Sequence, residues 1–444
     1  MKTKHEIIDF LKSELNIAII KPYLPLHILE DYKNNHPKKT RQRLYSMELV
    51  LQAMIYQSLA EDKSEQNAVM FIHEYYMKLQ KEIETKQKEL MSAIMEEQQS
   101  DIKKKQGRPR KHLLKVQKSK LKEISLNTSS YDQARQRFPL EVLEEMLKSI
   151  RTDLVKEKPW HGHQVYIADG TTAKTVDTKE LREHFMPKVD KNPQPLPLMR
   201  IEGLINLYGG YLVDVEISDY SSSEGQMIKK LYRSIPEDTV LLADDLYSSY
   251  GHFAFCQTKG VYLISQGKHK RTDKIVKIYS KNDVIVEWRW QQRPAWFTEE
   301  DELPKTMQVR RISYKDPEHP EKMAYIYTNL IDPEKYPAMD ILALYLCRWD
   351  IELSFREIKI VLNMEYLRSK TVAMVMKEVL IYLILYNIIK IIMIKSIDKN
   401  DIDFFSHGET VQSSNTIYQK QDAYIDRLGR TYARKSPGRN GYIH

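Results

Sequence analysis

Short runs of β-forming residues begin near Gln164, and two of the most apolar runs end directly in aspartates. Val165–Ala168 is followed by Asp169, and Thr239–Ala243 is followed by Asp244. A short apolar run bounded by a turn signal predicts a strand buried in an α/β sheet. A carboxylate directly after such a strand emerges at the edge of the sheet, where α/β proteins commonly hold ligands, although strand-end aspartates also cap helices and close turns.

The rest of the chain predicts a mixed, helix-rich protein. Only 14 of 444 residues are glycine, which disfavours a turn-dense all-β fold, and the length suggests two or three domains. Helical periodicity runs through residues 1–100 and again through 339–362 and 369–394. Further strand patterns lie at Arg200–Asn206, Tyr211–Ile217, Lys274–Trp290, Gln308–Ser313 and Met323–Asn329.

These patterns predict four regions. We expect an all-helical N-terminal region over 1–100, a basic linker over 101–125, an α/β region over 150–395 and a polar C-terminal tail over 396–444. Asp244 and Glu352 are separated by 352 − 244 = 108 residues, which is too long for a simple loop and is filled by strand patterns. A β-rich insertion at about 266–335 is therefore expected.

Positive charge is concentrated in one segment. Lysine and arginine exceed aspartate and glutamate by 69 − 61 = +8, and ten of these basic residues lie between Ile102 and Lys122 without an acid, so the remainder nets 8 − 10 = −2. This distribution indicates a local polyanion partner. Within the segment, Arg108, Arg110 and Lys111 lie in a Gly-Arg-Pro-Arg-Lys stretch that resembles an AT-hook, an arm for the minor groove of DNA. The alternative is a solvated basic linker.

Other sequence features favour a protein that acts inside the cell. The two cysteines, Cys256 and Cys347, form no C-x-x-C pair, which supports neither a disulfide framework nor a zinc site. The first residues lack the apolar stretch of a secretory signal. The apolar stretch Val379–Ile394 falls short of the roughly 20 residues that span a bilayer, so we expect a buried helix and no membrane.

A third group of polar residues lies on the helix expected to begin near Met339. Tyr345, Arg348, Glu352 and Lys359 are spaced so that 100° per residue places all four in a narrow sector of one helix face. This face presents a carboxylate flanked by cations. By itself the pattern is more typical of an exposed helix with ion pairs such as that between Arg348 and Glu352.

The spacing Y-x2-R-x3-E-x6-K resembles the hallmark of DDE transposases of the insertion-sequence-four group. The text around the acids is similar to that family over roughly residues 150–395. The segments that carry the resemblance are Asp169-Gly170-Thr171-Thr172, Leu241-Leu242-Ala243-Asp244 with Leu246-Tyr247-Ser248, Arg348-Trp349-Asp350-Ile351-Glu352, Phe355-Arg356-Glu357, Leu367-Arg368-Ser369-Lys370 and Tyr386-Asn387. The N-terminal segments Arg41-Gln42-Arg43-Leu44 and Ser130-Tyr131-Asp132-Gln133-Ala134-Arg135 also resemble the group.

The resemblance implies a ribonuclease-H-like catalytic core in which Asp169, Asp244 and Glu352 hold two divalent metal ions. Hard carboxylates suit Mg²⁺ or Mn²⁺, and two such ions assist in-line displacement at phosphorus. Tyr345, Arg348 and Lys359 are implied to grip the DNA end through phosphate oxygens, which the chemistry of their side chains permits. Many relatives have an arginine where Asp245 stands, so the adjacent acid leaves the second ligand slightly ambiguous, and motif register selects Asp244.

Three tryptophans are candidates for stacking a flipped base, as in relatives that excise through a hairpin intermediate. Trp288, Trp290 and Trp296 all fall within the expected insertion. Trp288 and Trp290 are two positions apart on one predicted strand face, so the alternative for them is a place in the core. Trp296 is the more loop-like residue of the three.

The function expected from these features is a cut-and-paste transposase. It would act as a homodimer on double-stranded DNA, cleave the inverted-repeat ends of a transposon with metal, and join the 3′ ends to target DNA, in the cytoplasm and at the bacterial or archaeal nucleoid. The alternatives are a vestigial, sequence-specific DNA-binding protein derived from such an element, and a plain nuclease with the same core.

Overall fold

The computed structural model describes residues 17–37, 45–60, 62–102, 126–150, 160–186, 195–222, 224–267, 273–290, 297, 303–315, 321–348 and 364–398. The chain divides into two compact units. The helical unit comprises Leu15–Lys21 and Leu26–Pro139, and the sheet unit comprises Met1–Glu14, Pro22–Pro25 and Leu140–His444. Each unit has its own secondary structure and is described separately.

The helical unit is built from packed helices. Its helices are α2 (Ile17–Ile20), α3 (His27–Asn35), α4 (Met47–Leu59), α5 (Glu65–Ile102) and α6 (Ser129–Arg137), and the 3₁₀ turn η1 (Lys21–Tyr23) follows α2 at the border between the units. α4 begins after Ser46, whose hydroxyl accepts a hydrogen bond from the Leu49 amide at 3.3 Å. A serine cap of this kind satisfies an amide that the first helical turn leaves unbonded.

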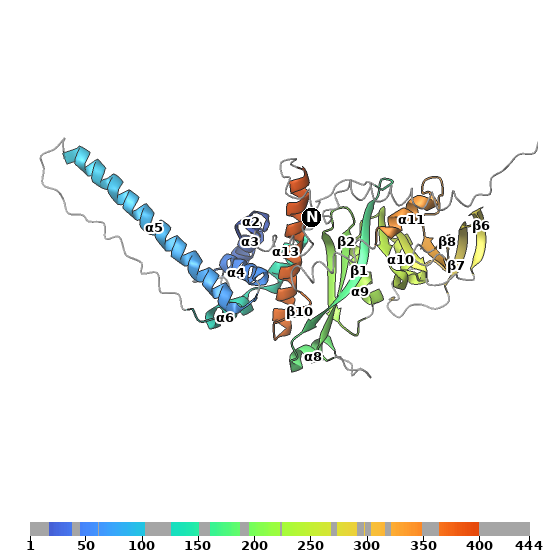
Figure 1. The fold of residues 1–444 in the computed structure, drawn as a ribbon, viewed down its shortest axis with the longest axis horizontal. Coiled ribbons are helices and arrows are strands. Elements are labelled where there is room, and N and C mark those ends of the chain that lie inside the picture. The colour runs from blue at the N-terminus through green and yellow to red at the C-terminus, as the bar shows by residue number, and fades with distance from the viewer. Residues whose placement is uncertain are drawn as a thin grey trace, which may run out of the picture. The chain divides into compact units, whose positions relative to one another are not determined.

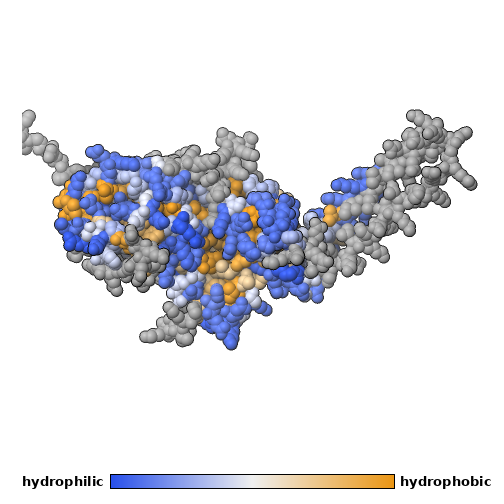
Figure 2. Space-filling view, turned by 180° about the vertical axis from the view of Figure 1, so that it is seen from behind, coloured by the Kyte–Doolittle hydropathy of each residue, from blue (hydrophilic) through white to orange (hydrophobic). Residues whose placement is uncertain are grey.

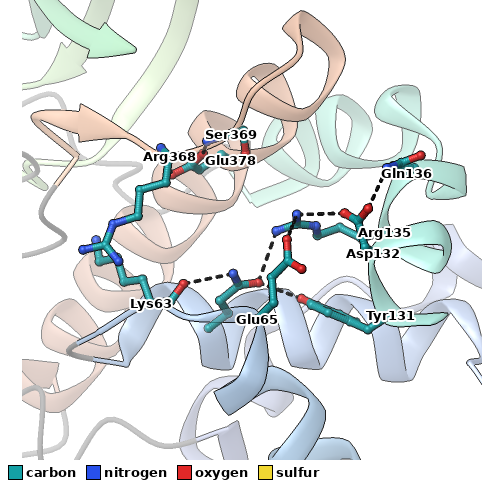
Figure 3. A network of polar contacts seen from close by, with 10 residues as sticks. Lys63, Glu65, Tyr131, Asp132, Arg135, Gln136, Arg368, Ser369 and Glu378 are labelled. Carbon is teal, nitrogen blue, oxygen red and sulfur yellow. Dashed lines mark hydrogen bonds and ion pairs between the residues drawn. The ribbon is translucent and has the colours of Figure 1, made fainter. Parts of the chain in front are cut away.

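Arg135 ties α6 to its neighbours in the helical unit. Its guanidinium binds the carboxylate of Glu65 on α5 and, at 3.1 Å, that of Asp132 one turn earlier on α6 (Figure 3). The hydroxyl of Tyr131 donates to Gln57 on α4 at 2.9 Å. The segment Ser130–Arg135, which contributes to the family resemblance, therefore packs helices together in this structure.

The sheet unit contains one ten-stranded sheet among the described residues (Figure 1). Its path runs β3-β2-β1-β4-β5-β9-β8-β7-β6, and β10 pairs with β1 off this path. The strands are β1 (Gln164–Thr175), β2 (Leu198–Asn206), β3 (Leu212–Asp219), β4 (Thr239–Ala243), β5 (Tyr262–Gly267), β6 (Lys274–Ser280), β7 (Asp283–Arg289), β8 (Thr306–Lys315), β9 (Met323–Thr328) and β10 (Tyr366–Leu367).

Two parallel pairings lie between antiparallel ones along the path of this sheet. β1, β2 and β3 form an antiparallel meander, whereas β1, β4 and β5 are parallel neighbours. All five residues of β4 are buried, as expected for the central strand of a covered parallel sheet. The strands β6–β9 continue the same sheet, because β9 pairs antiparallel with β5.

Helices and short turns complete the sheet unit. They are α7 (Leu140–Ile150), α8 (Lys179–Phe185), α9 (Glu224–Leu231), η2 (Tyr232–Ser234), η3 (Asp245–Tyr247), α10 (Tyr250–Thr258), α11 (Ala338–Leu346) and α13 (Val372–Asp398). One apolar core combines residues of β1, β2, β4 and β5 with α9 and α10 and extends to Trp288 on β7 and Tyr327 on β9. The long mixed sheet therefore shares a continuous core.

The apolar helix α13 packs on the β2–β3 hairpin. The Asn387 side chain accepts from the Leu212 amide at 2.8 Å and donates to the Leu212 carbonyl at 3.0 Å, and the Tyr386 hydroxyl donates to the Gly210 carbonyl at 2.6 Å. The Val372–Ile392 stretch is long and apolar enough to cross a membrane by length and composition, so the sequence estimate of its length was too short. However, 72% of its most apolar window is buried inside the structure, as in the core helix of a soluble protein.

The strand at the end of the sheet exposes apolar side chains. Ile275, Val276 and Ile278 of β6 are 47%, 45% and 67% exposed. Orange colour marks apolar residues at this end of the sheet unit, on the left of the space-filling view (Figure 2). Lys274 and Lys277 lie on the same strand, so β6 presents a mixed apolar and cationic surface.

Candidate active site

The two aspartates that follow the apolar runs lie at the same level of the sheet. β1 and β4 are parallel neighbours with Ile167 opposite Leu242. Continuing this register by two residues places Asp169 level with Asp244, and the two-residue period of a strand puts both side chains on one face. Both carboxylates are partly exposed. The structure therefore brings together the two acids that the sequence singled out.

Asp169 lies where β1 changes partners. The first residues of β1 pair with β4 as far as Ile167, and its last residues, Lys174 and Thr175, pair with β10. Asp169 lies between these two parallel pairings and opposite Gly203 of β2. One oxygen of its carboxylate accepts a hydrogen bond from the Gly170 amide at 3.0 Å. Asp169 thus lies at the point where β1 leaves β4, before it pairs with β10.

Asp244 begins the turn after β4. Its carboxylate caps η3 by accepting from the Leu246 amide at 2.9 Å, and the Ser265 hydroxyl of β5 donates to its backbone carbonyl at 2.6 Å. Asp245 lies one residue further on, inside η3 and past the end of the strand. The register of β4 with β1 thus assigns the position level with Asp169 to Asp244 and not to Asp245.

Tyr345 and Arg348 lie near Asp244. Tyr345, only 1% exposed, donates from its hydroxyl to Gln266 Oε1 at 3.4 Å, and the β4–β5 register continued by one residue places Gln266 level with Asp244. Burial raises the pKa of Tyr345 to about 12; the Asp244 carboxylate acts in the same direction and Arg348 opposes it. The Arg348 guanidinium lies 5.7 Å from the centre of the Tyr345 ring. The phenol is therefore even harder to ionise than an ordinary tyrosine, and it lies within the field of Asp244.

The helix that carries Tyr345 ends sooner than the sequence predicts. α11 stops at Leu346, and the amides of Cys347 and Arg348 bond to the carbonyls three residues earlier, at 3.1 and 3.0 Å. Such bonds tighten the last turn of a helix into a 3₁₀ turn. Arg348 therefore lies in the turn after α11, and not on a helix continuous with Tyr345.

Several predicted site residues lie outside the described part of the chain. They are Glu352, Lys359, Trp296, Arg108, Arg110 and Lys111. Within the described residues, no group of three or more His, Cys, Asp or Glu side chains could hold a metal ion. Asp169 and Asp244 are two of the three carboxylates in the predicted set, and the third, Glu352, belongs to the part not described.

The two described tryptophans of the predicted insertion have different surroundings. Trp288 is 1% exposed, donates from its ring nitrogen to Asp273 at 2.9 Å, and packs against the rings of Phe253 and Tyr327. This is the core alternative considered for it. Trp290 lies just past the end of β7 and is 37% exposed, so its ring is accessible.

The structure adds residues that the sequence reasoning missed. Gln266 lies inside β5 and has a neutral side chain, so a rule that looks for acids directly after strands does not find it. Glu202 and Tyr247 form a buried hydrogen bond between β2 and η3. Their 45-residue separation leaves no local signal in the sequence.

Comparison with known proteins gives a consistent family. The model of the family described as Transposase DDE domain matches residues 160–388. Transposase InsG for insertion sequence element IS4, from Escherichia coli (strain K12), is 24% identical over 322 residues, which cover 70% of this chain and 69% of that protein. Putative transposase InsZ of the same organism is 30% identical over 130 residues, covering 28% of this chain and 44% of that protein.

A solved structure was also found to be similar. It is the synaptic complex of piggyBac transposase with hairpin DNA, with a TM-score of 0.35 and 12% identity, covering 62% of this chain and 55% of that one. The family model spans slightly more than half of the chain and includes both aspartates, Tyr345 and Arg348. The chain therefore belongs to the DDE transposase family, in the IS4 group.

Proposed function

We propose that this transposase cleaves the ends of its transposon by metal-dependent hydrolysis and transfers the 3′ ends into target DNA. The observation that carries the proposal is the level placement of Asp169 on β1 and Asp244 directly after the parallel strand β4, with Tyr345 and Arg348 near Asp244. We propose Glu352 as the third acid and Lys359 as a further phosphate contact, on the spacing of the sequence.

The strand order supports a ribonuclease-H-like core within the sheet unit. The path β3-β2-β1-β4-β5 combines an antiparallel meander with parallel neighbours; Asp169 lies on its central strand β1, and Asp244 directly follows the neighbouring strand β4. Strands β6–β9 would then represent the β-rich insertion, joined to the core through the β5–β9 pairing. The accessible ring of Trp290 is the described candidate within it for stacking a flipped base.

The donor set fits a hard divalent cation. Asp169 and Asp244 supply carboxylate oxygens from one face of the sheet, and Mg²⁺ and Mn²⁺ prefer oxygen ligands. When bound, two such ions would activate the attacking oxygen and stabilise the leaving oxygen of an in-line displacement at phosphorus. Asp169, Asp244 and Glu352 would hold them.

Tyr345 and Arg348 would position the scissile phosphate. The phenol is a hydrogen-bond donor at physiological pH, and burial raises its pKa further from the range in which it would ionise, to about 12. The guanidinium offers a planar fork of donors that matches two phosphate oxygens. Both side chains are largely buried, which keeps them in place before DNA arrives.

Recognition of the inverted repeats would fall to the helical unit and to the basic segment between Ile102 and Lys122. The ten basic residues of that segment suit the phosphate backbone of double-stranded DNA. Two transposon ends must be brought together, so we propose a homodimer on DNA. The protein would act in the cytoplasm, at the nucleoid.

The decisive experiment uses purified protein and labelled DNA carrying the inverted repeats that flank the gene. We expect Mg²⁺- or Mn²⁺-dependent nicking at the 3′ ends and strand transfer, both abolished in Asp169→Asn, Asp244→Asn and Glu352→Gln. Asp245→Asn is the matched control, since it removes the neighbouring acid, which lies one residue past the position level with Asp169, and it should retain activity. A wild type that binds the ends but cuts with neither metal would support the vestigial DNA-binding alternative.

A further inference from the structure

A buried carboxylate lies under the segment that carries Asp169. Glu202 of β2 is fully buried and stands opposite Gly170 in the β1–β2 register, next to the pair of Asp169 and Gly203. Since successive side chains of a strand alternate between faces, Glu202 points to the face opposite the two acids. It therefore cannot join them as a ligand on their own face of the sheet.

The Glu202 carboxylate reaches beneath β1 at Gly170. A Cβ atom on Gly170 would lie 2.5 Å from Glu202 Oε2, closer than such atoms approach one another in real proteins. Only a glycine at this position leaves the carboxylate where it is. The carboxylate thus contacts the residue whose amide donates to Asp169 at 3.0 Å.

The same carboxylate is bound from the other side by the turn after Asp244. The hydroxyl of Tyr247, the last residue of η3, donates to Glu202 Oε1. The first residues of this turn are held by Asp244 itself, whose carboxylate accepts from the Leu246 amide and whose carbonyl accepts from the Tyr247 amide at 3.3 Å. Glu202 therefore connects β2, the Asp169 segment of β1 and the turn begun by Asp244.

We propose that Glu202 and Tyr247 are positioning residues that fix the two acids relative to one another, and so set the affinity of the pair for a divalent cation. The proposal rests on the proposed function, because it takes Asp169 and Asp244 as the metal-holding acids. Groups that orient metal ligands from behind commonly change metal affinity by about 10- to 100-fold when they are removed.

A matched control lies in the same buried polar cluster. The Tyr232 hydroxyl is 2.9 Å from His252 Nδ1, and the ring of His252 lies 5.1 Å from that of Tyr247. Tyr232 is as buried as Tyr247, yet its hydroxyl bonds to α10 and not to Glu202. Tyr232→Phe therefore removes a buried hydroxyl from the cluster without touching the connection between the acids.

The test measures Mn²⁺ binding to the full-length, metal-free protein by electron paramagnetic resonance, together with thermal unfolding without metal. We expect Tyr247→Phe to weaken Mn²⁺ binding about 10-fold, and Gly170→Ala, which displaces the Glu202 carboxylate, to act in the same direction. Glu202→Gln keeps an acceptor for Tyr247 and should fall between these variants and the wild type. The Mn²⁺ affinity of Tyr232→Phe should stay within about twofold of that of the wild type. This should hold even if its unfolding temperature falls by as much as that of Tyr247→Phe.

The proposal is overturned if Tyr247→Phe and Gly170→Ala bind Mn²⁺ as tightly as the wild type, or if Tyr232→Phe weakens binding equally. It is also overturned if the wild type does not bind Mn²⁺, or if Asp169→Asn leaves that binding unchanged. A wild type that binds Mn²⁺ through Asp169 but cleaves no transposon end would count against the proposed function alone. The two failures are therefore distinguishable.

Discussion

At the scale of single residues, Tyr345 shows how burial prepares a polar group for a role. Its pKa rises from 10 to about 12, chiefly because the ring is removed from water. The folded protein therefore keeps this proton at pH values where the unfolded chain begins to lose it. The stabilisation associated with the group is fully present below pH 10 and is lost as the pH rises towards 12.

Tyr345→Phe should reduce end cleavage while leaving the fold intact. A hydrogen bond to a charged group contributes about 1.5 to 3 kcal/mol, which corresponds to a loss of roughly 10- to 100-fold in the cleavage rate. Because the phenol stays protonated, the variant and the wild type should have the same pH profile between pH 7 and about 9.5. Single-turnover cleavage across this range tests both points, and a basic limb present only in the wild type would contradict the assignment.

His252 predicts an acid-sensitive stability. Burial lowers its pKa from 6.5 to about 3, so below pH 6.5 the unfolded chain takes up a proton that the folded protein does not. The contribution of His252 to the free energy of unfolding is thus fully present above pH 6.5, and it falls as the pH falls towards 3. The loss from this one group between pH 7.5 and 5.5 is about 1.4 kcal/mol.

Urea unfolding at the two pH values measures this loss, with His252→Gln as the comparison. The variant carries no titrating ring, so its free energy of unfolding should fall by about 1.4 kcal/mol less than that of the wild type. Equal losses in the two proteins would assign the acid sensitivity to other groups.

At the scale of elements, the loop before α11 is fixed by a buried ion pair. Arg310 on β8 binds both carboxylate oxygens of Asp283 on β7, at 2.8 and 2.6 Å, and donates to the Tyr336 carbonyl at 2.7 Å. Arg310 is fully buried. Since α11 begins two residues after Tyr336, this arginine joins the outer strands to the helix that carries Tyr345.

Arg310→Met should lower the free energy of unfolding by about 3 to 5 kcal/mol, because it leaves the Asp283 carboxylate buried without its partner. The double variant Arg310→Met/Asp283→Leu removes both charges and should be more stable than the single one. Urea unfolding of the wild type, both single variants and the double variant completes the cycle. A single variant that loses less than about 1 kcal/mol would show that the pair is not coupled as described.

Local patterns predicted the strands well, and the site only in part. Thr239–Ala243 forms β4 as predicted, because an apolar run followed by acids is a local signal. The end of α11 at Leu346 depends on a tightening of the last turn that spacing arguments do not contain. Trp288 and Trp290 share a two-residue spacing, but β7 ends at Arg289, so only Trp288 is held in the core. Glu202 could not be interpreted from sequence, because its partner Tyr247 is remote.

At the scale of the whole molecule, charge is separated along the chain. The segment Ile102–Lys122 carries ten positive charges, and all other residues together net −2. A nearly neutral remainder has little non-specific attraction for DNA, so binding should depend strongly on this one segment. Each phosphate contact that is lost reduces the steepness of the plot of log affinity against log salt concentration by about 0.9.

Arg108→Ala/Arg110→Ala should therefore reduce the slope of log affinity against log salt by up to about 1.8, without changing the metal concentration needed for cleavage. Lys148→Ala/Lys179→Ala removes two exposed lysines elsewhere and serves as the control of equal charge. Filter binding at several salt concentrations gives the slopes. Identical slopes for the two double variants would favour the solvated-linker alternative.

The change of strand partners at Asp169 also determines when the sheet can be completed during synthesis of the protein. β1 pairs with β10, whose first residue lies 366 − 174 = 192 positions after its partner Lys174. A ribosome adding about 5 to 20 residues per second needs roughly 10 to 40 s to cover that interval. During this time β10 has not yet been synthesised, so the end of β1 beyond Asp169 lacks its parallel partner. The part of the sheet around Asp169 can therefore be completed only after residue 367 has been synthesised.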